Sequence, residues 1–290
     1  MVAVNEVSFQ LDGGITGLLG PNGAGKSTIL HMIAGFLAPS SGSVTVGGHP
    51  ARGHVEMYRH VGLVPEREEV YPFLTGRGFV DANARLQGMP AAEAAAAAER
   101  AIGLVELEGA QDRPIGTYSK GMRQRAKVAA ALVHEPPILL LDEPFNGMDP
   151  RQRLQMMGLL RRMAAEGRTI LFSSHILEEV ERLADQVLVI VAGRLAASGP
   201  FRDIRRLMTD RPHTFTIRSS DDRALAAALV TEPTIGSVSV SDGQLMVGTA
   251  DFGAFSRRVA GVARRSDITL HELLPTDESL ESVFSYLVRR

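Results

Sequence analysis

The chain has 290 residues, of which 44% are hydrophobic and 22% charged, and its formal net charge is −2. This composition is ordinary for a folded globular protein and differs from that of disordered chains. Because 31 basic residues nearly balance 33 acidic ones, the charge gives no reason to expect nucleic acid as a partner. The absence of cysteine excludes disulfides and thiolate metal sites, and it is compatible with a reducing cytoplasm.

Neither a membrane-spanning helix nor a secretory signal is expected. The longest apolar runs, ILLL and VLVIVA, are far shorter than the roughly 20 residues that a membrane-spanning helix needs. The N-terminal MVAVNEVSFQ lacks a basic region followed by an apolar one, as a signal peptide would have. The length indicates one domain of about 200 residues and a smaller one.

Residues 1–210 show the pattern of an α/β domain with a mixed, mostly parallel central sheet. Residues 42–48, GSVTVGG, alternate between apolar and polar positions and predict an antiparallel strand. Residues of about 74–134 predict a helical insertion, in which the alanine tract of PAAEAAAAAER is expected to face solvent. ILLLDEP and TILFSSH predict buried central strands, whose carboxyl ends are where such sheets carry chemistry.

Residues 213–290 are expected to form a small α+β domain. TFTI predicts a strand, DRALAAALV a helix, GSVSV and QLMVG a hairpin around residues 241–243, FGAFSRRVAGVA a helix and ITLHEL a last strand. The order βαββαβ is that of a ferredoxin-like fold. The final segment SLESVFSYLV is amphipathic and either packs on its own domain or forms a dimerisation helix.

A glycine-rich loop follows the apolar run ITGLL. Its sequence, GPNGAGKST, matches GxxxxGK[ST], in which backbone N–H groups turn inward around phosphate oxygens at the start of a helix. Lys26, one of only three lysines in the chain, is expected to reach the β- and γ-phosphates of a nucleotide, and the Ser27 hydroxyl to ligate Mg²⁺. The predicted phosphate-binding residues are Gly20, Pro21, Asn22, Gly23, Ala24, Gly25, Lys26, Ser27 and Thr28.

Two adjacent carboxylates end the apolar strand of ILLLDEP. Asp142 is expected to hold Mg²⁺ directly or through water. Glu143 is expected to point toward the γ-phosphate and to accept a proton from the attacking water. Because two carboxylates at the end of a buried strand are unfavourable without a cation, we prefer this interpretation to a structural one.

The segment YSKGMRQR indicates a second anion-binding helix terminus. Ser119 is a natural N-cap, and Gly121 allows a phosphate to approach the backbone closely. Two such termini in one chain need either two phosphates or two copies of the chain.

These motifs together resemble those of the ATP-binding subunit of an ATP-binding-cassette (ABC) transporter. GPNGAGKST resembles the family's Walker A motif, YSKGM its signature LSGGQ, LLLDEP its Walker B motif, NGMD its D-loop and SSH its switch histidine. The resemblance covers residues 1–210 and implies a P-loop NTPase fold with an antiparallel β subdomain and a helical insertion. The SKGMRQR form and the C-terminal domain resemble the bacterial branch that partners separate permeases, often as exporters of drugs, antibiotics or other small molecules.

The resemblance implies a homodimer that encloses two ATP molecules. The Walker A residues of one subunit would face the signature residues Ser119, Lys120, Gly121 and Met122 of the other. Asp149 would help to couple the two sites. The switch histidine, His175, would contact the γ-phosphate and orient both Glu143 and the attacking water.

The sequence departs from the family pattern at several positions. The family usually has a glutamine at the position of Glu66, a residue that normally contacts Mg²⁺ and the attacking water. Glu66 can still ligate Mg²⁺, because carboxylate oxygens suit that cation, but its charge predicts slower or more Mg²⁺-dependent turnover. In the signature, Lys120 and Met122 replace a glycine and a glutamine. Lys120 either strengthens phosphate binding across the dimer or points to solvent.

The chain begins where the family's first strand is usually finished, and the residue that stacks on adenine normally lies in that stretch. Phe9 sits in an apolar pattern that predicts a core position, and we do not assign it to adenine. Either the start of the sequence is misplaced or other groups hold the adenine.

The expected function is that of an ATP-hydrolysing subunit that powers transport, in the direction of export, through a separate integral membrane permease. The chain would then be a cytoplasmic homodimer held at the inner face of the cell membrane by the permease. The alternative is a soluble ATP-driven switch of the same ATPase family. Such relatives usually carry two cassettes or a long coiled coil, and neither pattern is found here. The C-terminal domain is expected either to regulate the ATPase or to steady the dimer.

Overall fold

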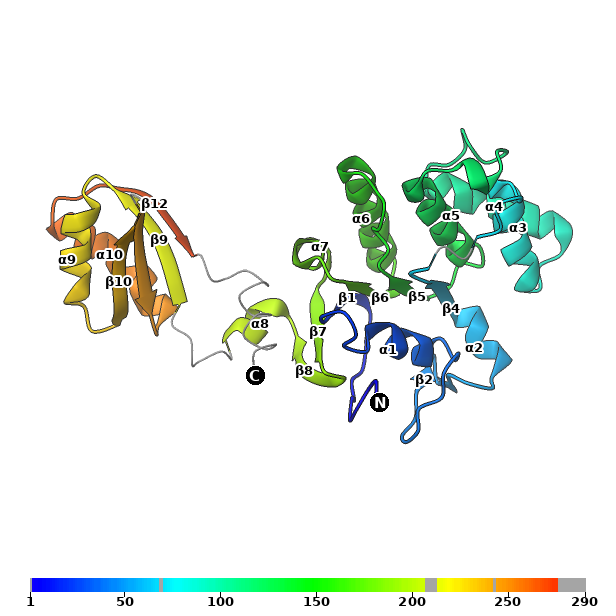
Figure 1. Cartoon of the computed structure of the whole chain (residues 1–290), viewed down its shortest axis with the longest axis horizontal. Coiled ribbons are helices and arrows are strands. Elements are labelled where there is room, and N and C mark those ends of the chain that lie inside the picture. Colours follow the sequence, from blue (N-terminus) through cyan, green and yellow to red (C-terminus); the bar gives the residue numbers. More distant parts are fainter. Residues whose placement is uncertain (1, 68–69, 207–212, 242–243, 276–290) are drawn as a thin grey trace. The chain divides into compact units, whose positions relative to one another are not determined.

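The computed structural model describes residues 2–67, 70–206, 213–241 and 244–275 (Figure 1). The chain divides into two compact units between Gly199 and Pro200. The sequence analysis placed this boundary near residue 210, whereas the structure assigns helix α8 (Phe201–Arg206) to the second unit. The expected C-terminal amphipathic segment and the hairpin turn at residues 242–243 lie outside the described residues.

A six-stranded sheet in the order β4-β5-β6-β1-β7-β8 forms the centre of the first unit. Its strands are β1 (Gly14–Leu19), β4 (Val61–Val64), β5 (Ile138–Asp142), β6 (Thr169–Ser174), β7 (Gln186–Val191) and β8 (Arg194–Gly199). The neighbours from β4 to β7 pair in parallel, and β8 runs antiparallel to β7. The predicted mixed, mostly parallel sheet is therefore confirmed.

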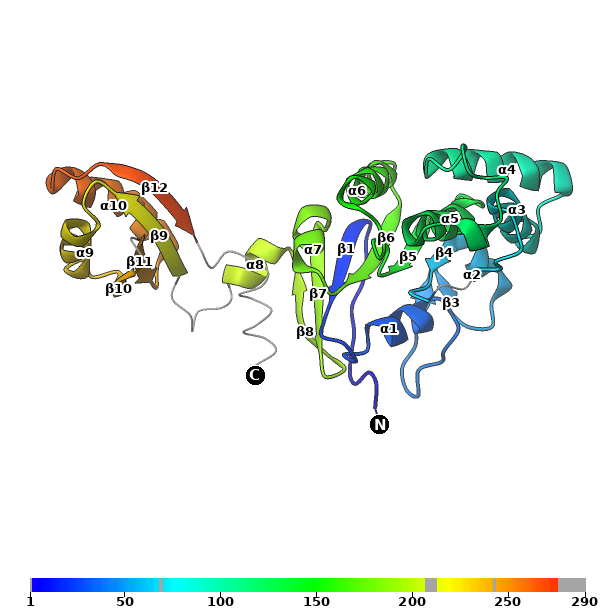
Figure 2. The same cartoon turned by 45° about the horizontal axis from the view of Figure 1, so that its top comes forward.

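Helices cover both faces of this sheet. Helix α1 (Lys26–Ile33) lies on one face, and α6 (Pro150–Ala165) and α7 (Leu177–Leu183) lie on the other (Figures 1 and 2). Apolar side chains from α1 and from the sheet are buried together because this removes their surface from water. The buried members of this core are Leu18, Ala24, Ile29, Leu30, Ala34, Val46, Ala51, Met57, Val61, Leu140, Leu171, Leu188 and Ile190.

Two smaller parts complete the first unit. The short strands β2 (Thr45–Val46) and β3 (His49–Pro50) form an antiparallel hairpin within a segment predicted to contain a longer strand, and α2 (Val55–His60) follows. The predicted helical insertion contains the helices α3 (Gly76–Leu86), α4 (Ala91–Leu104), η1 (Ile115–Thr117) and α5 (Lys120–Leu132).

The sequence analysis expected the alanine tract of α4 to face solvent, but the structure buries one face of it. The side chains of Ala94, Ala97, Ala98 and Ala101 are buried on one face of the helix. Because alanine is small, this face packs closely against α3 and α5, which lie beside it in Figure 2. The insertion is therefore one packed layer, and it places α5 next to the end of β5.

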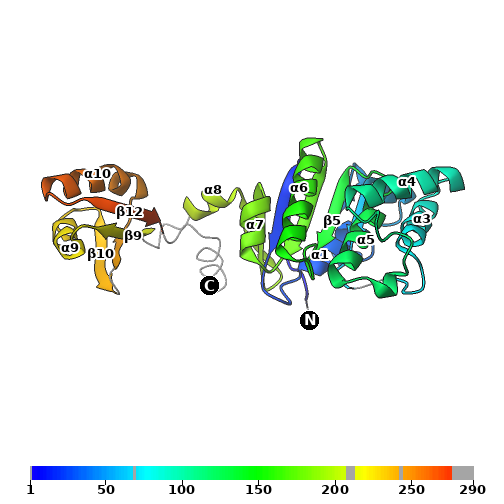
Figure 3. The ribbon, with the colours of Figure 1, turned by 90° about the horizontal axis from the view of Figure 1, so that it is seen from above.

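After α8, the described residues of the second unit have the predicted order βαββαβ. Its elements are β9 (His213–Ser219), α9 (Asp222–Val230), β10 (Ile235–Ser241), β11 (Gln244–Thr249), α10 (Phe252–Arg265) and β12 (Leu270–Pro275). The strands form an antiparallel sheet in the order β10-β11-β9-β12, as in a ferredoxin-like fold (Figure 3). Both helices share one apolar core with this sheet, in which Phe215, Leu225 and Phe255 are buried.

Candidate active site

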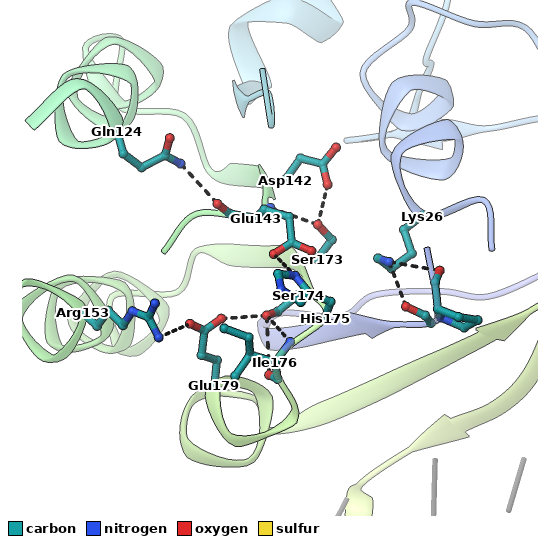
Figure 4. Close-up of polar contacts among 12 residues, drawn as sticks. Lys26, Gln124, Asp142, Glu143, Arg153, Ser173, Ser174, His175, Ile176 and Glu179 are labelled. Atoms are coloured by element: carbon teal, nitrogen blue, oxygen red, sulfur yellow. Dashed lines mark hydrogen bonds and ion pairs between the residues drawn. The ribbon is translucent and has the colours of Figure 1, made fainter. Parts of the chain in front are cut away.

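Three neighbouring parallel strands end at one edge of the central sheet. In the register of β5, β6 and β1, Ser173 lies opposite both Asp142 and Leu18. The loops that leave these strands therefore begin side by side: the glycine-rich loop after β1, the turn at Glu143 after β5 and the turn at His175 after β6. Figure 4 shows the polar side chains that gather there. Ligand sites of open α/β sheets lie at this edge.

Lys26 is folded back onto its own loop. It is the first residue of α1 and is only 8% exposed. Its Nζ donates hydrogen bonds to the carbonyl oxygens of Gly20, at 2.8 Å, and Pro21, at 3.3 Å. Burial raises the pKa of the nearby Glu143 carboxyl, and the positive charge of Lys26 is one of the influences that oppose this rise. The ammonium thus sits between the loop and the candidate base.

The loop itself fits a polyphosphate. Gly23 and Gly25 have φ angles of +79° and +104°, which glycine adopts without strain and which turn backbone N–H groups toward one side. Helix α1 begins directly after Gly25 and has no side-chain N-cap, so its first N–H groups lack a side-chain acceptor. Its positive dipole end faces the same place, where phosphate oxygens would be stabilised. Ser27 and Thr28 follow on α1 and are half-buried.

Asp142 is held at the end of β5 by the neighbouring strand. Ser173 donates a hydrogen bond from Oγ to Asp142 Oδ1, and it accepts one from the Glu143 backbone N–H at 3.0 Å. Asp142 is 4% exposed. One serine thus orients the carboxylate and fixes the peptide that carries the candidate base. The sequence analysis missed Ser173, although its position one residue before the end of TILFSS was a usable signal.

The donor set suits magnesium, which is not part of the structure. The Ser27 hydroxyl and the Asp142 carboxylate supply the oxygen ligands that this cation prefers. No group of three or more His, Cys, Asp and Glu side chains within the described ranges could hold a metal ion. The predicted third ligand, Glu66, is exposed and lines a cavity of about 530 Å³ with Lys120, Arg123 and other residues.

Glu143 and His175 form a direct pair across the ends of β5 and β6. His175 Nδ1 lies 2.9 Å from Glu143 Oε2. Burial raises the pKa of Glu143, while the hydrogen bond from His175 and the charges of His175 and Lys26 oppose that rise. Glu143 also has a φ of +50°, an uncommon conformation for a side-chain-bearing residue. The fold therefore holds the buried Glu143 carboxylate in one orientation, beside the half-exposed imidazole of His175.

The signature segment begins α5 as expected. The Ser119 side chain accepts a hydrogen bond from the Met122 backbone N–H at 3.2 Å and so caps the helix. Ser119 and Lys120 are exposed, and Met122 is half-buried. Gly121 has a structural reason that the sequence did not reveal: a Cβ there would lie 2.4 Å from Gln152 Oε1. The Gly147 backbone oxygen would lie 3.0 Å from the same Cβ, so a larger residue would crowd both the Gln152 side chain and this backbone.

Asp149 caps the neighbouring helix α6. Its carboxylate accepts from the Gln152 backbone N–H at 2.9 Å, and the Gln152 side chain accepts from the Asp149 N–H at 3.3 Å. This capping box, followed by Pro150, explains why α6 starts here. The carboxylate is exposed, and within one chain its described partner is this cap.

Lys127, another of the three lysines, was missed by the sequence analysis. It is 4% exposed, and its Nζ donates to the carbonyl oxygens of Pro65 at 2.6 Å, Glu66 at 3.4 Å and Arg67 at 3.0 Å. It therefore anchors the loop that carries Glu66 to helix α5. The rarity of lysine was the signal that could have identified it.

Comparison with known proteins agrees with this geometry. Residues 4–146 match the family model described as ABC transporter. The linearmycin resistance ATP-binding protein LnrL of Bacillus subtilis is 33% identical, over 99% of this chain and 94% of its own length. Nod factor export ATP-binding protein I of Burkholderia lata is 40% identical over 200 residues, which are 68% of this chain and 66% of that protein. The chain thus spans just under two thirds of the Nod factor relatives.

Solved structures show the same fold. A structure of an ATP-binding subunit of an ABC transporter aligns with a TM-score of 0.65 at 32% identity, over 71% of this chain and 87% of that chain. A dimeric bacterial ABC transporter cassette aligns with a TM-score of 0.64 at 23% identity, over 68% of this chain and 90% of that chain, and supports the fold alone.

The fold and the site define a P-loop ATPase. The chain belongs to the ABC transporter family, among its ATP-binding subunits. The resemblance to this family seen in the five motifs is confirmed. Within the part of the chain that the structure describes, no helix has the length and apolar character needed to cross a membrane.

Proposed function

We propose that two copies of this chain bind ATP and Mg²⁺ between them and hydrolyse ATP to drive export of a small molecule through a separate membrane permease. The convergence of Lys26, Asp142, Glu143 and His175 at one sheet edge carries this proposal. The direction and the cargo class follow from relatives that are named for export and for antibiotic resistance.

Binding of ATP uses the loop and its lysine. The backbone N–H groups at the start of α1 donate hydrogen bonds to the phosphate oxygens, and the Lys26 ammonium exchanges its bonds to the Gly20 and Pro21 carbonyl oxygens for bonds to phosphate oxygens. Thr28, next along α1, adds a hydroxyl close to the same helix end. Ser27 and Asp142, with Glu66 as a further ligand, would hold Mg²⁺, which would neutralise charge on the phosphates.

Hydrolysis requires a base next to the γ-phosphate. Glu143 accepts a proton from water as the water oxygen attacks the γ-phosphorus and the bond to the ADP oxygen breaks. His175 holds the Glu143 carboxylate through Nδ1, which leaves the far side of its ring free to contact the phosphate. Because burial raises the pKa of Glu143, the carboxylate is a stronger base than an exposed one.

Each site is completed by the second copy. The N-terminus of α5, where Ser119 and Lys120 are exposed and Gly121 and Met122 follow, faces the Walker A loop of the partner. Its N–H groups and dipole suit the γ-phosphate, and Lys120 adds a positive charge there. Asp149, exposed at the start of α6, couples the two sites.

The permease docks in an apolar groove of the first unit. This groove, of about 900 Å³, lies between the sheet domain and the helical insertion, and Phe36, Tyr71 and Leu86 on its rim are 60%, 60% and 85% exposed. Large exposed apolar side chains that line one hollow mark an interaction site. Pro65, next to Glu66, also lines the groove, so a docked segment would touch the loop that leads to the ATP site. This docking would hold the chain at the inner face of the membrane.

The test uses a tagged Glu143→Gln variant, which should bind ATP and remain dimeric because the base is lost. The variant is expressed in the native host, membranes are solubilised in mild detergent with ATP, and co-purified proteins are identified. A polytopic membrane protein in stoichiometric amount is the expected result, and Lys26→Ala is the control that should not form the ATP-bound dimer. Recovery of soluble partners alone, with ATP-dependent dimerisation intact, would support the switch protein instead.

A further inference from the structure

A second polar network lies beside His175 (Figure 4). It starts at the segment that ends in Asp149. Arg153, in the first turns of α6, donates from Nε to the Met148 carbonyl oxygen at 3.2 Å. The same guanidinium forms an ion pair with Glu179 of α7, with Nη1 3.2 Å from Oε1. One arginine thus joins the residue before Asp149 to the helix that follows His175.

The network continues into the turn that carries His175. Glu179 Oε2 accepts a hydrogen bond from Ser174 Oγ at 2.6 Å. Ser174 Oγ in turn accepts from the Ile176 backbone N–H at 3.0 Å. The Ser174 hydroxyl can donate only one hydrogen bond. The Glu179 carboxylate is closer to it than the Ile176 carbonyl oxygen, which is 3.5 Å away, and is therefore the acceptor. The residues on both sides of His175 are therefore fixed by one serine, whose orientation Glu179 sets.

The burial of this network is not explained by a gain in stability. Ser174 and Glu179 are 0% and 5% exposed. A buried ion pair adds little stability compared with apolar side chains of the same size, because both charges lose their hydration. What the pair does provide is a fixed geometry, since a carboxylate held by an arginine and a serine has few alternative positions.

We propose that Arg153, Glu179 and Ser174 are positioning residues for His175. They link the segment Met148–Asp149, which faces the partner copy, to the imidazole that contacts the base Glu143. The proposal deepens the proposed function and rests on it. When the partner engages Asp149, the shift of the Met148 carbonyl is passed through Arg153 and Glu179 to the turn at His175. Hydrolysis at one site thereby depends on how the two copies are docked.

The experiment measures ATP hydrolysis by the full chain. Ser174→Ala removes the link to the turn and keeps the ion pair, whereas Glu179→Gln keeps an acceptor for Ser174 and removes the ion pair. Each variant is prepared alone and together with His175→Ala, and single-turnover hydrolysis of radiolabelled ATP extends the range of measurable rates. Glu135→Gln, which breaks the exposed ion pair with Arg100, is the matched control and should leave the rate unchanged.

We expect Ser174→Ala and Glu179→Gln to lower kcat on the order of tenfold to a hundredfold with little change in KM, because a small misplacement of a catalytic group has effects of this size. In the His175→Ala background the same changes should have no further effect. An equal loss in both backgrounds would show a merely structural role and would overturn the proposal, as would an unchanged kcat.

A second readout does not depend on activity. Amide hydrogen exchange of the peptide that contains Ile176 should be faster in Glu179→Gln than in the wild type, because without the ion pair the side chain that orients Ser174, the acceptor of the Ile176 N–H, is less firmly held. If His175→Ala itself leaves hydrolysis unchanged, the proposed function fails. Unchanged exchange in Glu179→Gln would instead overturn the positioning network alone.

Discussion

Nδ1 of His175 lies 2.9 Å from Oε2 of Glu143 and so joins the ends of two adjacent parallel strands. Glu143, the residue that follows β5, has a left-handed backbone with a φ of +50°. The contact with His175 also sets the acidity of the carboxyl group. Burial raises the pKa of Glu143, and the bond to His175 is the first of the influences that lower it again.

As the pH is lowered, the rate of ATP hydrolysis should therefore begin to fall at a pH above the ordinary pKa of a glutamate side chain. A base must be ionised to act, so activity is lost as pH falls through its raised pKa. His175→Ala removes an influence that lowers the pKa, and the acid limb of kcat should move to higher pH. The measurement is kcat against pH for both proteins, with the exposed His271→Ala as control. A limb that stays in place or moves to lower pH would contradict the role of the pair.

Glu66→Gln tests the departure from the family pattern. Glutamine would remove a negative charge near the γ-phosphate, so turnover should rise, or half-maximal activity should need less Mg²⁺. The structure places Glu66 at a cavity with Lys120 and Arg123, whose charges would partly offset its own. The assay is a Mg²⁺ titration of ATP hydrolysis, with the exposed Glu56→Gln as the matched substitution. If rate and Mg²⁺ dependence are both unchanged, Glu66 has no role in the site.

Lys127→Met should loosen the loop of Pro65–Arg67 without emptying the space that the lysine stem fills. Loss of the ammonium leaves these carbonyl oxygens without this hydrogen-bond donor. If the oxygens remain inaccessible to water, the free energy of unfolding should fall by about 1–3 kcal/mol. Hydrogen exchange of this loop should become faster, and hydrolysis should respond less to the permease. Lys120→Met, at an exposed position, is the stability control. Equal exchange in Lys127→Met and wild type would show that other contacts hold the loop.

Much of the site could be predicted because its functional residues lie in short contiguous motifs. The positions of Lys26, Asp142 and Glu143 follow from a glycine-rich loop and from apolar runs that end in polar residues. Parallel strands then bring these ends together without further information. The βαββαβ order of the second unit was equally readable, since each element has its own period and turn residues.

Contacts between distant segments were not readable in the same way. Nothing in the sequence near Gly121 shows that Gln152 lies against it, and nothing near Glu179 shows that Arg153 will neutralise it. Such pairs depend on the packing of one helix against another, which periodicity leaves open. The burial of one face of the α4 alanine tract was missed for the same reason, because the high helix propensity of alanine predicts a helix without showing which of its faces is packed.

The last prediction concerns the second unit, which has a core of its own. Phe215 is buried there with its ring centroid 4.5 Å from that of Phe255 and 5.1 Å from that of Phe252. Phe215→Ala should cost about 3–5 kcal/mol, a large part of the stability of a small domain. Because the first unit has a separate core, calorimetry should show one transition shifted down and another unchanged. Val230→Ala, at a position that is 64% exposed, should change stability by less than about 0.5 kcal/mol. A shift of both transitions together would mean that the units unfold cooperatively.

The same variant tests the role of this unit. If unfolding of the second unit weakens dimerisation but leaves ATP hydrolysis intact, the unit steadies the dimer. If it changes kcat at saturating protein concentration, the unit regulates the ATPase.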